Sequence, residues 1–400
     1  MPASNDRQAM IDVDGVTRSR VEVEEWLRAS LPDAWSACIG AGRSPGSTSR
    51  YPDFDEDGWL AELFARRYLM ASWPVEYGGL GWSREMALAG FEALSRYEVP
   101  LPLYVTSLLL AGHGLLQYGT AEQQNRFLPK IAAASEIWCQ LFSEPEAGSD
   151  LASLRTRAER DGRGWIVTGQ KVWSTWAHFA RWGLLLARTG ATESRHRGLT
   201  CFVVDMDLPG IEVRPLRQLT GDASFNEVFM DQVLVDDSKR LGPVNEGWRV
   251  ARSVLQAERG ELGRRRVGGI DIHRLIDRHR GAADPEARQH LAARYAQERI
   301  LGWMAWRGYG RGPEAQTVKL LRAEANMALQ SLAIRLEGPR AAAHDSGDSE
   351  TAEIVYGFLR SRANSIAGGT SEIMRNLIGE QLLGLPREPR PAVGPRGPDR

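Results

Sequence analysis

The middle of this chain changes from a helical to a strand pattern, and this change constrains the fold more than any other feature. Residues 137 to about 240 contain short runs rich in Val, Ile, Leu and aromatic residues, such as GWIVTGQKVW, WGLLLARTG and GLTCFVVDM. Gly, Pro, Asp and Thr separate these runs, as in short β-strands joined by turns. A segment of roughly a hundred such residues predicts an all-β domain, either a barrel or a sandwich.

Helical blocks flank this segment on both sides. Stretches such as VEVEEWLRASL and GWLAELFARRYLMA before it, and AQTVKLLRAEANMALQSLAIRL after it, carry apolar residues at three- and four-residue spacing. This spacing predicts amphipathic helices. In the loop WPVEYGGLGWS that interrupts the first block, Ser83 is placed to cap the next helix.

We therefore expect an α+β multidomain fold. It comprises an N-terminal helical domain over residues 1–135, a middle β domain over 136–242 and a C-terminal helical bundle over 243–385. The last stretch, 386–400, is rich in Pro, Arg and Gly and holds almost no apolar residues. Such a composition cannot bury a core, so we expect this tail to be disordered.

Composition and charge narrow the possible functions. The formal net charge is -1, so no overall attraction to nucleic acid or membrane is expected. The longest apolar stretches are far shorter than the roughly 20 residues that a spanning helix needs. The N-terminus lacks the pattern of a signal peptide, so we expect a cytoplasmic protein.

Metal chemistry is not expected either. The three cysteines are scattered and none lies in a CxxC, and the seven histidines form no HExxH or similar spacing. Neither a disulfide framework nor a zinc site is therefore predicted.

Three separated motifs carry the functional signal. They are WCQLFSEPEAGSDLASL at 138–154, GQKVWST at 169–175 and GGTSEIMRNLIGEQLLGLPRE at 368–388. The small residues of the first motif allow close approach of the backbone to a ligand. In the second, an aromatic side chain followed by two hydroxyls at a strand end can flank a planar ring and bond its polar edge. Each piece alone is more often structural than functional.

Together, in this order and spacing, the motifs resemble the acyl-CoA dehydrogenase family. The resemblance implies a helical N-terminal domain, a middle β domain and a C-terminal four-helix bundle, with FAD bound between the β domain and the bundle. It implies FAD-dependent α,β-dehydrogenation of an acyl-CoA thioester, in which a carboxylate takes the α-proton and the β-hydrogen passes as hydride to flavin N5. It also implies an electron-transfer flavoprotein or similar acceptor, a role in lipid metabolism and a tetramer built as a dimer of dimers.

The resemblance assigns roles to individual residues. Phe142 and Ser143 are expected to contact the flavin, Trp173 to lie against its ring, and Ser143 and Thr175 to bond its polar edge. The remaining expected cofactor-binding residues are Ser174, Thr370 and Glu372. The residues expected to meet the substrate or its CoA are Ser149 and Arg259.

The base is the main departure from the family pattern. Many members carry a catalytic Glu directly before the last Gly-Thr, where this chain has Gly368. A glycine cannot abstract a proton, but its N–H remains available to polarise the thioester oxygen.

A second family solution, seen in isovaleryl-CoA dehydrogenase and its relatives, places the base in L-x-x-E-R on the first long helix after the β domain. The chain has this pattern at residues 255–259, which makes Glu258 the expected base. Ala251, Leu255, Glu258 and Leu262 share one helix face, so this carboxylate falls within an apolar stripe, where it is costly unless paired or functional. A surface Glu paired with Arg from the 259–266 cluster is the competing interpretation.

Two cofactor-clamping motifs of the family, R-x-x-F-G and Q-x-x-G-G, are missing. The corresponding stretches read IDRHRGAADPEARQHLA and IRLEGPRAAAHDSG. The pattern resembles a branch that includes steroid side-chain dehydrogenases, in some of which two unlike chains assemble. Two alternatives therefore stay open: an oxygen-using flavin oxidase or monooxygenase on the same fold, and a non-catalytic subunit of a hetero-oligomer.

Overall fold

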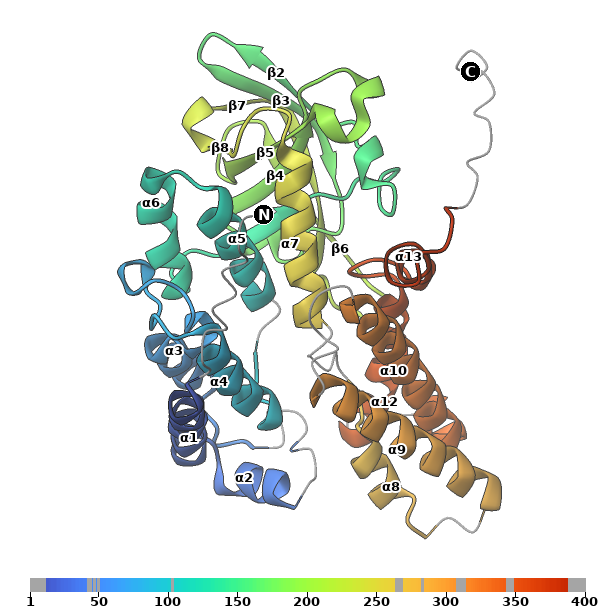
Figure 1. Cartoon of the computed structure of the whole chain (residues 1–400). Helices are drawn as coiled ribbons and strands as arrows, with labels where there is room; N and C mark the ends of the chain where they lie inside the picture. Colours follow the sequence, from blue (N-terminus) through green and yellow to red (C-terminus); the bar gives the residue numbers. More distant parts are fainter. Residues whose placement is uncertain are drawn as a thin grey trace, which may run out of the picture.

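The computed structural model describes residues 12–41, 45, 48, 51–101, 104–262, 269–281, 284–306, 314–342 and 349–387. Residues 388–400 of the predicted tail and the Arg264–Arg266 run lie outside this part. Within it, the order of elements is helices, then a sheet, then helices (Figure 1). The predicted order of a helical block, a β segment and a second helical block is confirmed.

The first helical region precedes the sheet. Its elements are α1 (Val13–Ser30), α2 (Asp33–Gly40), α3 (Glu56–Arg66), η2 (Tyr68–Met70), η3 (Val75–Tyr77), α4 (Arg84–Arg96), α5 (Tyr104–Tyr118) and α6 (Ala121–Ala132). The hydroxyl of Ser83 accepts from the N–H of Met86 at 3.2 Å, which confirms the predicted cap of α4. Thr120 and Gln123 form a capping box at the start of α6. Polar side chains thus set the start of each of these two helices.

The middle region is an eight-stranded sheet with the order β6-β7-β3-β2-β4-β5-β8, and β1 pairs with β4. The strands are β1 (Trp138–Leu141), β2 (Arg157–Asp161), β3 (Gly164–Lys171), β4 (Trp182–Arg188), β5 (Leu199–Asp205), β6 (Ile211–Leu216), β7 (Phe225–Val235) and β8 (Arg240–Leu241). Short 3-10 turns join them: η4 (Leu151–Ser153), η5 (Ala177–Phe179), η6 (Thr192–Gly198) and η7 (Asp237–Lys239).

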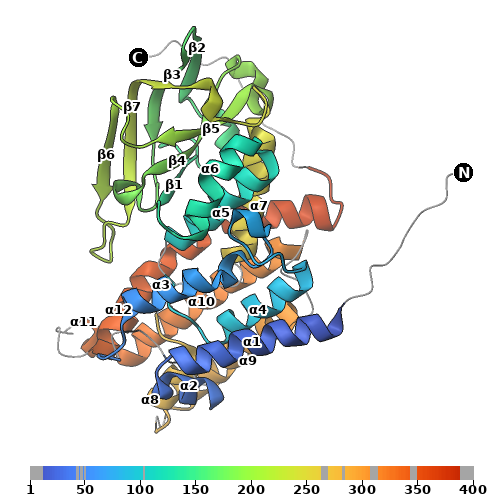
Figure 2. The same cartoon turned by 90° about the vertical axis from the view of Figure 1, so that its left-hand side faces the viewer.

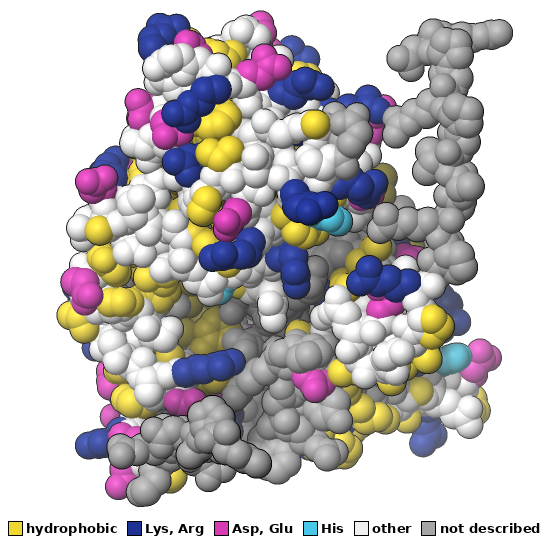
Figure 3. All heavy atoms as spheres, turned by 45° about the horizontal axis from the view of Figure 1, so that its top comes forward, with side chains coloured by type: hydrophobic (Ala, Val, Ile, Leu, Met, Phe, Trp, Pro, Cys, Tyr) yellow, Lys and Arg dark blue, Asp and Glu magenta, His cyan; other side chains and the backbone are white. Residues whose placement is uncertain are grey.

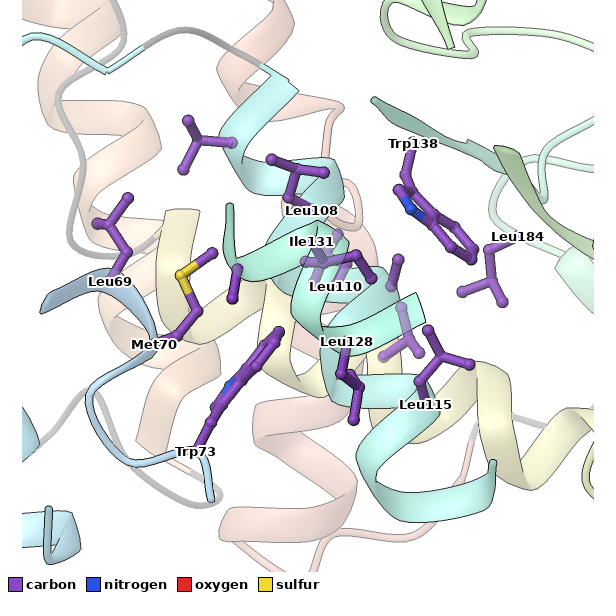
Figure 4. Packing of buried hydrophobic residues seen from close by; sticks show 14 of the residues in the cluster. Leu69, Met70, Trp73, Leu108, Leu110, Leu115, Leu128, Ile131, Trp138 and Leu184 are labelled. Carbon is purple, nitrogen blue, oxygen red and sulfur yellow. The ribbon is translucent and has the colours of Figure 1, made fainter. Parts of the chain in front are cut away.

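Strand β4 is buried along its whole length, and alternate residues serve two different cores. Leu184 and Leu186 join the core shared with the N-terminal helices, whereas Leu185 and Ala187 join a second core built with β3 and β7. Because side chains alternate across a strand, the sheet curls to enclose a core of its own. Figure 4 shows the first core, where Trp138 and Leu184 reach from the strands toward Leu115 and Leu128 of the helices.

The last region returns to helices. Its elements are α7 (Gly247–Leu262), α8 (Ile272–Arg278), α9 (Pro285–Trp306), α10 (Ala315–Glu337), α11 (Pro339–Ala342), α12 (Ser349–Ser361), η9 (Arg362–Ser365), α13 (Ser371–Leu377) and a π-helical turn, η10 (Ile378–Leu382). Helix α7 runs down from the sheet and packs against both α5 and α10 (Figures 1 and 2). It starts where Gly247 lies so close to the backbone of Thr200 that a Cβ would come within 2.5 Å of it. This helix therefore joins all three regions.

Candidate active site

The ends of β1 and β3 lie side by side and bring the first two motifs together. The N–H of Val172 donates to the carbonyl of Ser143 at 2.9 Å. Phe142 is buried in the first core, and Ser143 is half-buried. The flavin contacts expected of these two residues remain predictions.

A buried ion pair fixes this junction. The Lys171 ammonium donates to Glu144 Oε1 at 2.8 Å and to the carbonyls of Phe142 and Leu186 at 3.0 and 2.8 Å. Glu144 also accepts from the N–H groups of Arg155 and Thr156. Burial disfavours the charged form of both partners. For Lys171, burial outweighs the attraction of Glu144, so the pKa of the ammonium is lowered. For Glu144, the charge of Lys171 and the donated hydrogen bonds outweigh burial and lower its pKa.

Directly after β3, Trp173 projects into solvent in a left-handed backbone conformation. Its φ is 64° and its side chain is 60% exposed, which is unusual for a large aromatic residue. The ring packs edge-on against Phe225 at a centroid distance of 6.0 Å. The Arg360 guanidinium at the end of α12 lies 5.7 Å from the centre of the Phe225 ring. The surface formed by Trp173 and Phe225 therefore lies next to the end of α12. From there the chain leads into η9 and the third motif.

Asn226, a fully buried residue, fixes the backbone of Ser174 by hydrogen bonds. Its N–H and carbonyl pair with the backbone of Asn226, both at 3.1 Å, and the Asn226 side-chain amide donates to the same carbonyl at 2.9 Å. The Ser174 hydroxyl is buried and has no hydrogen-bond partner among the described residues. Thr175 is half-buried beside it.

These features fit a planar cofactor with a polar edge. The exposed Trp173 side chain gives an apolar surface, and Ser143 and Thr175, which are only half-buried, give hydroxyl groups close to it in the chain.

The third motif forms a tight turn before α13. Gly368 and Gly369 have φ of 66° and 102°, a conformation that glycine adopts without steric cost. The next residue, Thr370, caps α13 by accepting from the N–H of Ile373 at 3.2 Å. Glu372 is exposed in the first helical turn, where its pKa is lowered by hydrogen bonds from its own backbone and from Thr370. The cofactor contacts of Thr370 and Glu372 remain predictions.

Glu258 lies on α7, in the part of the helix that follows its buried residues. Val250, Ala251 and Val254 are buried against α5 and the sheet, and Glu258 continues this face one turn after Val254. The carboxylate-bearing residue is half-buried. Of the four residues predicted to form the stripe, Ala251 is buried and Leu255 and Glu258 are half-buried, while the side chain of Leu262 lies outside the described residues. The side chain of Arg259 lies outside the described residues.

Ser149 occupies the exposed loop that follows β1. The next residue, Asp150, pairs with Arg195 of η6 at 2.7 Å, so this loop and η6 are neighbours. Several Lys and Arg side chains surround the hollow at the centre of the face shown in Figure 3.

The structure thus brings Ser143, Trp173, Ser174 and Thr175 together at the ends of β1 and β3. The chain continues from α12 through η9 to the Gly368 turn, and Glu258 lies on α7. Sequence reasoning missed three buried polar residues: Lys171 and Asn226 at this junction, and Lys319 of α10, which donates to the carbonyl of Gly369. A lone lysine in a strand, and another on the core face of a helix, were the available signals. In the described part, no three His, Cys, Asp or Glu side chains could hold a metal ion, and no helix is long and apolar enough to cross a membrane.

Comparison with known proteins confirms the predicted fold class. The family models for acyl-CoA dehydrogenase match in order: the N-terminal domain at residues 47–135, the middle domain at 139–233 and the C-terminal domain at 245–383. Similar proteins include the acyl-CoA dehydrogenases IpdE1 of Mycobacterium tuberculosis and Mycolicibacterium smegmatis. They are 37% and 38% identical over 93% of this chain and 98% of each relative. A similar solved structure is the Tcur3481-Tcur3483 steroid ACAD, with 25% identity and a TM-score of 0.75 over 94% of this chain and 98% of that chain.

Proposed function

The chain belongs to the acyl-CoA dehydrogenase family, and from this premise we propose that it oxidises the Cα–Cβ bond of an acyl-CoA thioester with Glu258 as the base. Family membership makes it an oxidoreductase acting on CH–CH groups, with FAD as its cofactor. The observation that carries the proposal is the exposed Trp173, held in a left-handed conformation where the first two motifs meet.

The residues at the ends of β1 and β3 hold the cofactor in this proposal. Trp173 covers the flavin ring, while Ser143 and Thr175 bond its polar edge and the buried Ser174 holds the segment between them. Thr370 and Glu372, at the start of α13, contact it from the C-terminal side. When bound, FAD supplies at N5 the acceptor for the β-hydride.

Two groups of the chain, the Glu258 carboxylate and the Gly368 N–H, are proposed to promote removal of the α-proton. The Glu258 carboxylate takes it from Cα, and the electron pair of that C–H bond forms the new double bond as the β-hydrogen leaves with its own pair. Negative charge grows on the thioester oxygen during this step, so a preorganised donor stabilises it. The Gly368 N–H fits this role because none of the described residues accepts a hydrogen bond from it.

The CoA end of the substrate is proposed to lie over the loop that carries Ser149 and over η6. Arg195 and Arg197 of η6 and Arg249 at the start of α7 provide positive charge nearby. Phosphate groups bind well to such guanidinium groups. Arg259 is proposed to meet the same part of the substrate.

A second chain is proposed to complete the assembly. The two stretches that lack the family's cofactor-clamping motifs meet each other here: Arg278 donates to Glu337 at 2.9 Å, and both residues are largely buried. This arginine is therefore engaged within its own chain. Helix α9 leaves Tyr295, Ile300 and Trp303 exposed, and such apolar surface is typical of an interface. We propose that this surface packs on a like or unlike acyl-CoA dehydrogenase chain in a dimer of dimers, and that an electron-transfer flavoprotein accepts the electrons.

An absorbance spectrum tests the function. The purified protein is examined before and after anaerobic addition of butyryl-CoA, isovaleryl-CoA or cholyl-CoA. The last probe is included because the similar Tcur3481-Tcur3483 protein is named a steroid ACAD. We expect a flavin spectrum that at least one thioester bleaches.

The other outcomes separate the alternatives. A flavin that no thioester bleaches contradicts the proposal. Rapid reoxidation by oxygen with release of peroxide indicates an oxidase. Failure to hold FAD except after co-expression with a second chain, followed by bleaching that survives loss of Glu258, indicates a non-catalytic subunit.

A further inference from the structure

Lys319 of α10 is a buried lysine that binds the turn carrying Gly368. The residue is 5% exposed, although it bears a charge. Its ammonium donates to the carbonyl of Asn364 at 3.2 Å and to the carbonyl of Gly369. Burying an ammonium is costly unless its protons are hydrogen-bonded, and here two backbone carbonyls accept them.

The two carbonyls lie on either side of Gly368. Between them, the N–H groups of Ile366 and Ala367 both donate to the carbonyl of Ala363. After them, the backbone reverses through the left-handed Gly368 and Gly369. The ammonium of Lys319 therefore links the segment before Gly368 to the segment after it.

We propose that Lys319 is a positioning residue for the dehydrogenation. By binding Asn364 and Gly369 at once, it holds the turn so that the Gly368 N–H meets the thioester oxygen. This inference rests on the proposed function, because the thioester is the group that the N–H would polarise. Preorganised donors contribute much of the catalysis in such sites, and a displacement of about 1 Å can reduce the rate about 100-fold.

The placement of Lys319 on its helix supports this role. Gln316, Lys319, Ala323, Asn326 and Gln330 follow a three- and four-residue spacing that faces the interior of the bundle. A methionine or leucine at position 319 would satisfy this core without the cost of burying a charge. The lysine instead binds the one turn that holds the proposed oxyanion donor.

The test compares Lys319→Met and Lys319→Arg with the unmodified protein, using the thioester that bleaches its flavin. The control is Arg375→Ala, which removes a surface pair with Glu324 between the same two helices, α13 and α10. We expect kcat to fall about 30- to 100-fold in Lys319→Met, with KM and FAD content within about threefold. Lys319→Arg, which keeps the charge and the donors, is expected to recover most of this loss, and the control to stay within twofold.

Binding of acetoacetyl-CoA gives a readout that does not depend on turnover. Its α-proton is acidic, and a donor to the thioester oxygen favours the bound enolate, which absorbs in the ultraviolet. We expect Lys319→Met to hold about tenfold less enolate at the same pH. A double-mutant cycle with Gly368→Ala should be strongly non-additive, because both changes act on one turn.

A kcat within twofold of the unmodified protein in Lys319→Met, or effects that add in the cycle, would overturn the inference. A loss of thermal stability with unchanged kcat and enolate binding would show a merely structural lysine. Should Lys319→Met not fold, Lys319→Gln, which retains a neutral donor, is judged by the same criteria. If no thioester bleaches the unmodified protein, the proposed function itself fails.

Discussion

Lys171 and Glu144 form a buried ion pair with an Nζ–Oε1 distance of 2.8 Å, and this pair joins the two motifs that meet at the ends of β1 and β3. The glutamate belongs to the turn after β1, and the lysine is the last residue of β3. The pair therefore sets the position of Ser143 relative to Trp173. The ion pair contributes to the geometry of the site more than to the free energy of unfolding, because burial of two charges gives little net stability.

Replacing Lys171 by Met should destabilise the protein by about 3–5 kcal/mol, since Glu144 would be left buried without its counter-charge. FAD should be lost together with stability. Urea denaturation and flavin absorbance measure both effects. The matched control is Arg160→Met, which breaks an exposed pair with Asp237 and should cost less than about 1 kcal/mol. The double variant Lys171→Met, Glu144→Gln should be more stable than Lys171→Met alone; equal stability would contradict this account.

Glu136 makes the stability of the β domain depend on pH. Burial alone would raise its pKa, but hydrogen bonds from Arg126, Lys130 and Trp182 lower it to about 2. A carboxylate whose pKa is lowered by folding stabilises the protein above its ordinary pKa of 4.5 and loses this contribution as the pH falls toward 2. Because Arg126 and Lys130 are close to half exposed, we expect only about 1 kcal/mol.

Thermal melting of Glu136→Gln between pH 3 and pH 7 tests whether the stability contributed by Glu136 is lost at low pH. The variant should melt about 1–2 °C below the unmodified protein at pH 7, and the difference should shrink as the pH approaches 3. A difference that stays constant over this range would rule out the ionised carboxylate as its source.

Trp173→Ala should weaken FAD binding without destabilising the apoprotein. The side chain is 60% exposed, so its removal should change the free energy of unfolding by no more than about 0.5 kcal/mol. The dissociation constant of FAD, from fluorescence titration, should rise at least about tenfold, because stacking on an aromatic ring is worth about 1–3 kcal/mol. Trp173→Phe should restore part of the affinity, and Val75→Ala, at another exposed apolar position, should leave it unchanged. Full affinity in Trp173→Ala would place the flavin elsewhere.

Glu258→Gln should retain FAD and lose reduction of the flavin by substrate. A positioned base contributes about 10²- to 10⁴-fold, so anaerobic stopped-flow bleaching should slow by at least about 100-fold. Gln has nearly the same volume, and melting temperature and FAD content should remain close to the original. A rate within threefold of the original would exclude Glu258 as the base. Glu246→Gln, at an exposed position just before α7, serves as the control.

Local patterns predicted what depends on local physics. The run GWIVTGQKVW predicted the strand that is β3, and Ser83 predicted the start of α4, because alternation and capping act over a few residues. On α7 the predicted stripe included the buried Ala251 but not the buried Val254, and its Leu255 is half-buried.

Contacts between residues far apart in the sequence could not be predicted. Lys319 and Gly369 are 50 residues apart in sequence, and Lys171 and Glu144 are 27 apart. A lysine on a core face indicates a buried partner but does not identify it, because the packing of several elements decides which group arrives there. The left-handed backbone of Trp173 could not be predicted either, since a bulky residue rarely adopts it and the contacts of the neighbouring Ser174 with Asn226 join residues 52 apart in sequence.

The exposed apolar face of α9 should govern assembly. Ile300 and Trp303 are 49% and 57% exposed, so charged residues there should not unfold the chain. In an interface, by contrast, a buried unpaired charge costs several kcal/mol. We therefore expect the double variant Ile300→Glu, Trp303→Glu to shift the protein to a smaller species in size-exclusion chromatography and native mass spectrometry. Its circular dichroism spectrum should be unchanged.

Val21→Glu, at an exposed apolar position on α1, should leave the assembly intact. An unchanged mass for the double variant would place the subunit interface elsewhere on the surface, whereas FAD lost together with the larger species would link the second chain to cofactor binding.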